Sequence, residues 1–386
     1  MKKSWKRRGA RSNETDLTIP PMLARLAPSV CLLIACLSGV ALSQSVTNDR
    51  EIAARFAPLF YQALGDKPRS DYITNFDFDG DWRGDNNWEH TDDKSFPLRA
   101  YIYYSVSETQ THFFIHYAVF HPRDYKGGEQ KGIILSNIIR EGVKRGAGHD
   151  PTGLLPEAGV AHENDMEGAL VVVEKNGNDL KRAQTVFVET LHHDDFSFYL
   201  TGEPATKPYG TFTTEGQRLL LYVEPKGHGI EPYSGDEKQT AKKDFLIYKF
   251  TGKAEDPEAQ EGESVGYELL PIQTTLWARA RIGKEDKGAT YAAAHDYAKI
   301  SISVVQANGR VEVKQIKVGE IGETFLGKKG GLNMARPPWA WFDKHRRHEP
   351  LGLWFFDPAS VVKRDFNLPE SFSTAYVRLP FWAASK

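Results

Sequence analysis

Three ionisable side chains lie close together in the sequence, immediately before an apolar run. They are His162, Asp165 and Glu167, spaced at i, i+3 and i+5, and the run that follows is Leu170–Val173. This run is short and β-branched, which predicts a strand. Carboxylates at the mouth of such a strand suit Ca²⁺ or Mg²⁺, and an imidazole that binds directly favours Mn²⁺ or Zn²⁺. The alternative is a solvated loop whose charges hydrogen-bond one another.

An aromatic-rich strand is predicted upstream, over 113–124, and it ends in Pro122, Arg123 and Asp124. A strand with this ending, then a loop, then H-x-x-D-x-E leading into a valine-rich strand, resembles the necrosis-and-ethylene-inducing-peptide-like proteins. These are secreted cytolysins that carry the heptapeptide G-H-R-H-D-W-E.

The resemblance implies that four side chains hold one divalent cation at one end of a β-sandwich: Asp124, His162, Asp165 and Glu167. The chain departs from the family's heptapeptide at Asn164, where the family has His, and at Met166, where it has Trp. The loop between the strand-end aspartate and the heptapeptide is also much longer than in the family. The resemblance therefore implies the cation site but does not carry the toxin activity across.

Further histidines lie near this predicted site. His121 stands beside Pro122 at the strand end, and His228 lies in a turn that resembles a downstream strand end of the same family. We expect both at the rim of the site. The turn at 192–195, with two adjacent histidines, either frames the same rim or is an ordinary polar turn.

A second acidic segment has the D-x-D-x-D rhythm of calcium loops and contains Asp77, Asp79, Asp81 and Asp85. It departs from the EF-hand pattern, because Gly80 falls at the fourth position and Trp82 at the sixth. The alternative is a surface loop whose aspartates bond to nearby backbone groups.

Short strands separated by turn signals recur along the chain, which predicts a mainly β protein: a β-sandwich with long loop insertions and a few short helices. Strands are expected over 100–106, 112–120, 170–174, 185–190, 196–200, 218–224, 245–250, 299–306 and 311–318. Helices are expected over 50–64 and 289–298. We expect residues 44–386 to form one domain with a C-terminal extension.

Aromatic and basic residues gather near the C-terminus, with Trp339 and Trp341 ahead of a basic run over 344–348. Such a cluster can stack on sugars or meet anionic head groups. The alternative is a C-terminal segment whose indoles pack on the sandwich.

The first 43 residues are expected to be removed on export. Leu26–Leu42 has the length of a signal-peptide core, and Ala41 and Ser43 provide small residues for cleavage before Gln44. Met22 is the expected true start. The alternative is a lipoprotein anchored through Cys36. Secretion, or release into a periplasm, is the favoured interpretation, and the exported chain would contain no cysteine.

Composition and motifs narrow the classes of function. A net charge of −2 gives no electrostatic case for nucleic-acid binding. No G-x-S-x-G, H-E-x-x-H or P-loop motif is present. The first hypothesis is a secreted metal-binding β-sandwich that recognises a glycan or a lipid head-group surface. The second is a metal-dependent hydrolase with Glu167 or His228 as base. A third makes the cation a structural element that orders the segment 125–160.

Overall fold

The computed structural model describes residues 48–125, 161–177, 179–202, 208–237, 245–281, 289–328 and 335–381. Asp49–Lys386 form one compact unit. The predicted leader, Cys36 and the segment 126–160 lie outside the described residues. Among the residues described, no helix combines the length and the apolar character needed to span a membrane.

Strands dominate the described chain, as predicted. They are β1 Leu59–Ala63, β2 Tyr101–Thr109, β3 His112–Asp124, β4 His162–Glu174, β5 Gln184–His192, β6 Asp195–Leu200, β7 Gly210–Thr211, β8 Thr214–Glu215, β9 Arg218–Val223, β10 Ile230–Pro232, β11 Phe245–Phe250, β12 Ser264–Pro271, β13 Tyr291–Tyr297, β14 Ile300–Val305, β15 Val311–Ile316, β16 Gly319–Phe325 and β17 Ala375–Arg378.

The helices are short. Residues 48–55 are helical, and the α-helices that follow are α2 Asn87–Asp92, α5 Leu276–Ala280, α7 Leu353–Phe356 and α8 Pro358–Asp365. Single 3-10 turns occur at η1 Pro68–Ser70, η2 Leu180–Arg182, η3 Pro257–Ala259, η4 Ile272–Thr274, η5 Pro338–Ala340 and η6 Lys344–Arg346.

The described strands form one mixed sheet of fifteen strands and a separate pair, β13–β16. The main path runs β10-β9-β1-β11-β12-β2-β3-β4-β5-β6-β7, and β17 links β2 to the β14–β15 hairpin. The mainly β prediction is confirmed. The finer expectation of a β-sandwich is not confirmed. Fifteen of the described strands belong to one hydrogen-bonded sheet, which includes parallel pairs such as β1–β9 and β12–β2.

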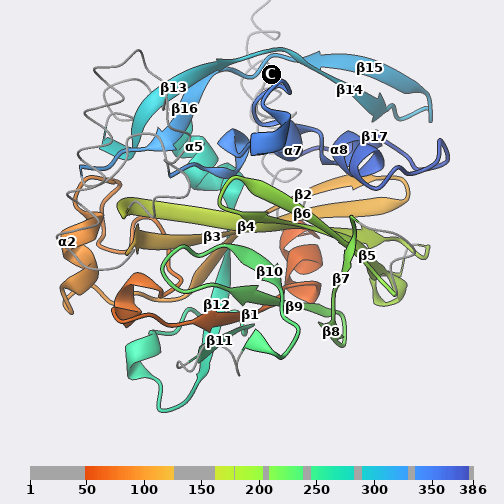
Figure 1. The fold of residues 1–386 in the computed structure, drawn as a ribbon. Helices are drawn as coiled ribbons and strands as arrows, with labels where there is room; N and C mark the ends of the chain where they lie inside the picture. Colours follow the sequence, from red (N-terminus) through yellow and green to blue (C-terminus); the bar gives the residue numbers. More distant parts are fainter. Residues whose placement is uncertain are drawn as a thin grey trace, which may run out of the picture. The chain divides into compact units, whose positions relative to one another are not determined.

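The long antiparallel pair β3–β4 is the centre of the sheet, and Figure 1 shows the two strands side by side. Both are rich in β-branched and aromatic residues, which fit a pleated surface. All of β3 is buried, and so is all of β4 except its last residue. The pairing runs without a shift from His112 opposite Glu174 to Asp124 opposite His162. The chain is thus covered on both faces here.

Alternation along β3 and β4 divides the apolar side chains between two cores. Phe114 and Leu170 belong to the core that also contains the C-terminal tryptophans. Ile115 and Val171 belong to the other core, which β1, β9, β11 and β12 complete. A strand pair between two cores is held firmly in place, so residues at its ends have defined positions.

The C-terminal segment packs against the first core. Trp339 and Trp341 are almost fully buried, and the Trp341 indole donates to the backbone carbonyl of Met166 at 3.1 Å. This confirms the alternative in which the indoles pack on the sheet. Gly168 makes the packing possible, because a Cβ there would lie 2.4 Å from the Trp341 ring and 2.6 Å from the carbonyl oxygen of Tyr117.

One expected helix is shorter than predicted, and the other is wrong. The helix predicted over 50–64 ends at residue 55, and Leu59–Ala63 beyond Pro58 is strand β1. β1 pairs with both β9 and β11, so sheet pairing outweighs its helical spacing. The alanine-rich stretch at 289–298 contains strand β13, which pairs with β16. Tertiary pairing overrides weak local propensity in both places.

Candidate functional site

The ends of β3 and β4 bring the predicted ligands to one region. Because the strands are antiparallel, the last residues of β3 lie opposite the first residues of β4. Asp165 lies opposite His121, and Glu167 lies opposite Val119. The four predicted ligands Asp124, His162, Asp165 and Glu167 are all buried.

Within this region the four residues make different contacts. His162 Nε2 lies 3.8 Å from Asp124 Oδ2. Asp165 is paired with His228, and Glu167 accepts a hydrogen bond from the backbone N–H of His193 at 3.1 Å. His162 is near enough to Asp165 to help to lower the pKa of that carboxyl. The four predicted ligands therefore lie in one region of the structure. That they bind one ion together stays a prediction.

A buried imidazole between two carboxylates is the strongest polar feature of the region. His228 Nδ1 lies 2.8 Å from Asp165 Oδ2, and its Nε2 lies 3.3 Å from Asp71 Oδ1. Burial alone would lower the pKa of His228, but the hydrogen bonds to Asp165 and Asp71 outweigh it and raise this pKa to about 10. Burial would raise the pKa of Asp165, and the His228 contact reverses this and holds it well below its usual range. His228 is thus an imidazolium at neutral pH.

The second histidine of the network is neutral. The ring of His121 stacks on His228 with centroids 3.7 Å apart and an interplanar angle of 6°. Burial and the charge on His228 hold the pKa of His121 well below its usual range. Its Nε2 lies 2.9 Å from Gln62 Oε1. Both histidines are fully buried, so they lie within the hydrogen-bond network rather than at an exposed rim.

The loop between β9 and β10 places His228. Its ends are joined by a bond from the N–H of Glu224 to the carbonyl of Gly229 at 3.0 Å. Lys226 and His228 both have positive φ, at 73° and 58°. Non-glycine residues adopt this conformation rarely, and it is held here because Asp71 accepts from the N–H of Lys226 at 2.7 Å.

Asn164, which replaces a family histidine, has a structural role. Its φ is 57°, and its amide donates to the carbonyls of Gly84 and Leu326, each at 2.7 Å. It also accepts from Asn87 Nδ2 at 2.6 Å. This side chain therefore ties the start of β4 to two neighbouring loops.

The second acidic segment, which contains Asp77, Asp79, Asp81 and Asp85, has contacts expected of a surface loop whose aspartates bond to nearby groups. Asp79 and Asp81 each accept from a backbone N–H two residues further on, at 3.2 and 2.7 Å. Asp85 pairs with Arg83 at 3.0 Å, and Asp77 accepts from Asn75 at 2.7 Å. Cation binding by this loop stays a prediction.

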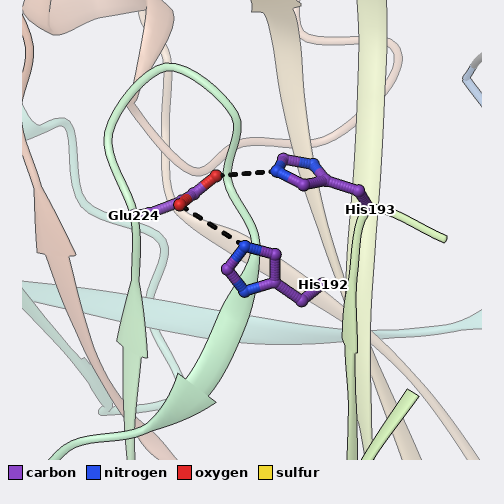
Figure 2. Close-up of side chains that lie close together, drawn as sticks. All are labelled: His192, His193 and Glu224. Atoms are coloured by element: carbon purple, nitrogen blue, oxygen red, sulfur yellow. Dashed lines mark ion pairs between the residues drawn. The ribbon is translucent and has the colours of Figure 1, made fainter. Parts of the chain in front are cut away.

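The sequence did not predict two residues that contact these histidines, Asp71 and Glu224. Asp71 follows a short 3-10 turn with no distinctive spacing, and Glu224 is the residue after β9. Figure 2 shows the Glu224 carboxylate facing the imidazoles of both His192 and His193. Its carboxylate lies 3.5 Å from His192 Nε2 and 2.9 Å from His193 Nε2. The two adjacent histidines are visible in the sequence, but only the folded sheet brings Glu224 close to them.

Comparison with known proteins gives a remote likeness. No family model matches the chain, and no curated protein matches it. The matching solved structures include one described as "Toxin fold for microbial attack and plant defense", at 14% identity and a TM-score of 0.25, with 47% of this chain and 67% of that chain covered.

Two other solved structures match with similar identity, TM-score and coverage. "NLPPya in complex with mannosamine" is 16% identical with a TM-score of 0.25 and covers 48% of this chain and 67% of its own. The necrosis and ethylene inducing protein 2 from the causal agent of cocoa's witches' broom disease is 14% identical with a TM-score of 0.25, covering 47% and 67%. The structures found are those of the family that the sequence motif resembles. At these TM-scores the likeness carries no conclusion about this chain's function.

Proposed function

We propose that this chain is an exported protein that binds one divalent cation with four side chains and uses the region so ordered to recognise a polar surface, either a glycan or a lipid head group. The ligands proposed are Asp124, His162, Asp165 and Glu167. Ca²⁺ or Mg²⁺ is the proposed ion, since three of the four donors are carboxylates.

The observation that carries the proposal is a concentration of buried negative charge. Five buried carboxylates lie around the ends of β3 and β4: Asp71, Asp124, Glu163, Asp165 and Glu167. His228 supplies one positive charge between two of them. The buried guanidinium of Arg123 is engaged with Asp92 at 2.7 and 2.9 Å. Carboxylate oxygens are the ligands that Ca²⁺ and Mg²⁺ prefer in proteins, so a divalent cation fits this concentration of buried negative charge.

A cation held by these residues would have capacity left for a ligand. Ca²⁺ takes about six to eight oxygen ligands, more than four side chains provide when each gives one atom. Water, or hydroxyl and phosphate oxygens of a sugar or head group, would fill the remainder. His193 borders Glu167 and contacts Glu224, which also contacts His192. All three are partly exposed, so they offer a polar surface beside the buried ligands.

The hydrolase alternative is less favoured. A general base at neutral pH must be able to accept a proton. In the ion-free protein His228 carries its proton, because the hydrogen bonds to Asp165 and Asp71 raise its pKa to about 10. Glu167 is left as the candidate base, and its Oε1 accepts from the backbone N–H of His193.

The proposal is tested by a binding screen. Purified protein is applied to glycan arrays and to vesicles of defined lipid composition, with Ca²⁺ and with chelator. We expect binding that chelator abolishes in the wild type and that Asp124→Asn lacks, while Asp77→Asn binds as the wild type does. Binding that is equal with and without chelator would contradict a cation-organised surface.

The export part has its own test. We expect mass spectrometry of the protein from its native producer to show an N-terminus at or near Gln44. A lipid on Cys36 would instead support the anchored alternative, and an intact leader would contradict both.

A further inference from the structure

Two turns at one sheet edge bring a second set of metal-binding side chains together. His192 and His193 come from the turn between β5 and β6, and Glu224 from the loop between β9 and β10. Their ligand atoms all lie within 4.8 Å of one another, and Figure 2 shows both rings turned toward the carboxylate.

We infer that His192, His193 and Glu224 form a site for a borderline transition-metal ion of the Zn²⁺ class, distinct from the hard-cation site proposed above. Two imidazoles and a carboxylate suit Zn²⁺, whereas Ca²⁺ and Mg²⁺ prefer oxygen donors. Ligand atoms at about 2.0–2.1 Å from a tetrahedral ion lie about 3.3 Å apart. His192 Nε2 lies 3.5 Å from Glu224 Oε2 and His193 Nε2 lies 2.9 Å from Glu224 Oε1, so each imidazole is near this spacing from one of the two carboxylate oxygens.

The protein holds both rings from the side away from the carboxylate. The His192 ring lies against Gly229, where a Cβ would come within 2.7 Å of it, so only glycine leaves room for this orientation. His193 Nδ1 lies 3.8 Å from Glu167 Oε1, which also accepts from the His193 backbone N–H. At 3.8 Å Glu167 is beyond hydrogen-bond distance of this ring nitrogen, but it lies on the side where a metal-bound histidine usually has a carboxylate as its outer partner.

The site is open on its outer side. The three side chains are 36%, 35% and 28% exposed. Three protein ligands with solvent access leave a coordination position for water or for an oxygen of an external ligand, as in sites with an exchangeable fourth ligand.

A second cluster, Asp195, Asp343 and His345, is a weaker candidate. The ammonium of Lys344 lies 2.8 Å from Asp195 Oδ2 and 3.7 Å from Asp194, so a lysine already compensates this charge. Since Asp195 already has a cationic partner, the cluster gives less reason to bind an ion.

The test uses full-length protein stripped with chelator and then titrated with Zn²⁺, and with Co²⁺ as a spectroscopic probe. We expect one Zn²⁺ per chain and cobalt ligand-field bands typical of nitrogen and oxygen donors. Glu224→Gln and His193→Asn should each weaken binding at least about tenfold. Asparagine tolerates the positive φ of 63° at position 193, so His193→Asn removes the imidazole without straining the turn.

Two control variants make the result decisive. His295→Asn removes a histidine that faces a single carboxylate, Glu323, at 3.6 Å, and it should bind Zn²⁺ as the wild type does. Asp124→Asn lacks a ligand of the proposed hard-cation site and should also bind Zn²⁺ normally. Absence of Zn²⁺ binding, or equal affinity in all variants, would overturn the inference. Loss in Asp124→Asn with retention in Glu224→Gln would place the ion at the other site and overturn it too.

Discussion

Single residues in this protein have pKa values set by what surrounds them, and Glu189 is an example away from the proposed ligands. It is fully buried in β5 and accepts from the Trp354 indole at 2.6 Å. Burial, with the nearby charge of Asp365, raises the pKa of Glu189 to about 8. The carboxyl is therefore protonated in the folded protein at neutral pH.

This raised pKa predicts a pH dependence of stability. Between pH 4.5 and about 8 the unfolded chain has lost the Glu189 proton while the folded protein keeps it. Because the unfolded state then binds fewer protons, the free energy of unfolding should fall as pH rises through this window. Glu189→Gln keeps an acceptor for Trp354 and should flatten the slope. Urea unfolding of both proteins at several pH values measures this, and identical slopes would contradict it.

At the same scale, the sequence predicted the chemistry of side chains better than their partners. The region holding His162, Asp165 and Glu167 was found because charged residues before an apolar strand are unusual. Asp71 could not be found, since nothing in its local pattern shows that it lies 3.3 Å from His228 across the fold. Partners that are distant in sequence depend on sheet order, which spacing does not encode.

At the scale of elements, the position of β4 depends on the missing side chain at Gly168 as well as on its apolar residues. Gly168 lies between the carbonyl of Tyr117 on β3 and the ring of Trp341. The strand alternation predicted β3 and β4 well, because both are long and strongly patterned. It could not predict β1 or β13, whose pairing partners decide their conformation.

Gly168→Ala should therefore destabilise the protein. Its Cβ would lie 2.4 Å from an indole carbon and 2.6 Å from a backbone oxygen, so Trp341 or the strand must shift. Overpacking of this kind costs about 1–3 kcal/mol. Denaturant unfolding should show the loss, and Gly262→Ala, with nothing within 4 Å of its added carbon, is the matched control. Equal stability of the two variants would show that the indole is not tightly held.

At the scale of the whole molecule, segments distant in the sequence are interleaved. β2 pairs with β12 on one side and with β17 near the C-terminus. The Trp354 carbonyl, on α7, lies 3.0 Å from His116 Nε2 on β3. A C-terminal half removed from the chain would lose these pairings, and its strands would be left with exposed edges.

We therefore expect residues 44–386 to unfold in one cooperative transition. Calorimetry should give a single peak whose calorimetric and van't Hoff enthalpies agree. Limited proteolysis that released a C-terminal fragment with its own cooperative melt would show that the chain contains a second independent domain.

The most direct test of the proposed cation site compares melting temperatures with Ca²⁺ or Mg²⁺ and with chelator. Binding to the folded state alone stabilises it by about 2.7 kcal/mol at a hundredfold excess over Kd. The wild type should melt higher with the ion, as should Asp77→Asn and His193→Asn, which alter the other two candidate sites. Asp165→Asn should melt low and hardly respond. An equal response of Asp165→Asn and wild type, or no response in either, would contradict the proposed site.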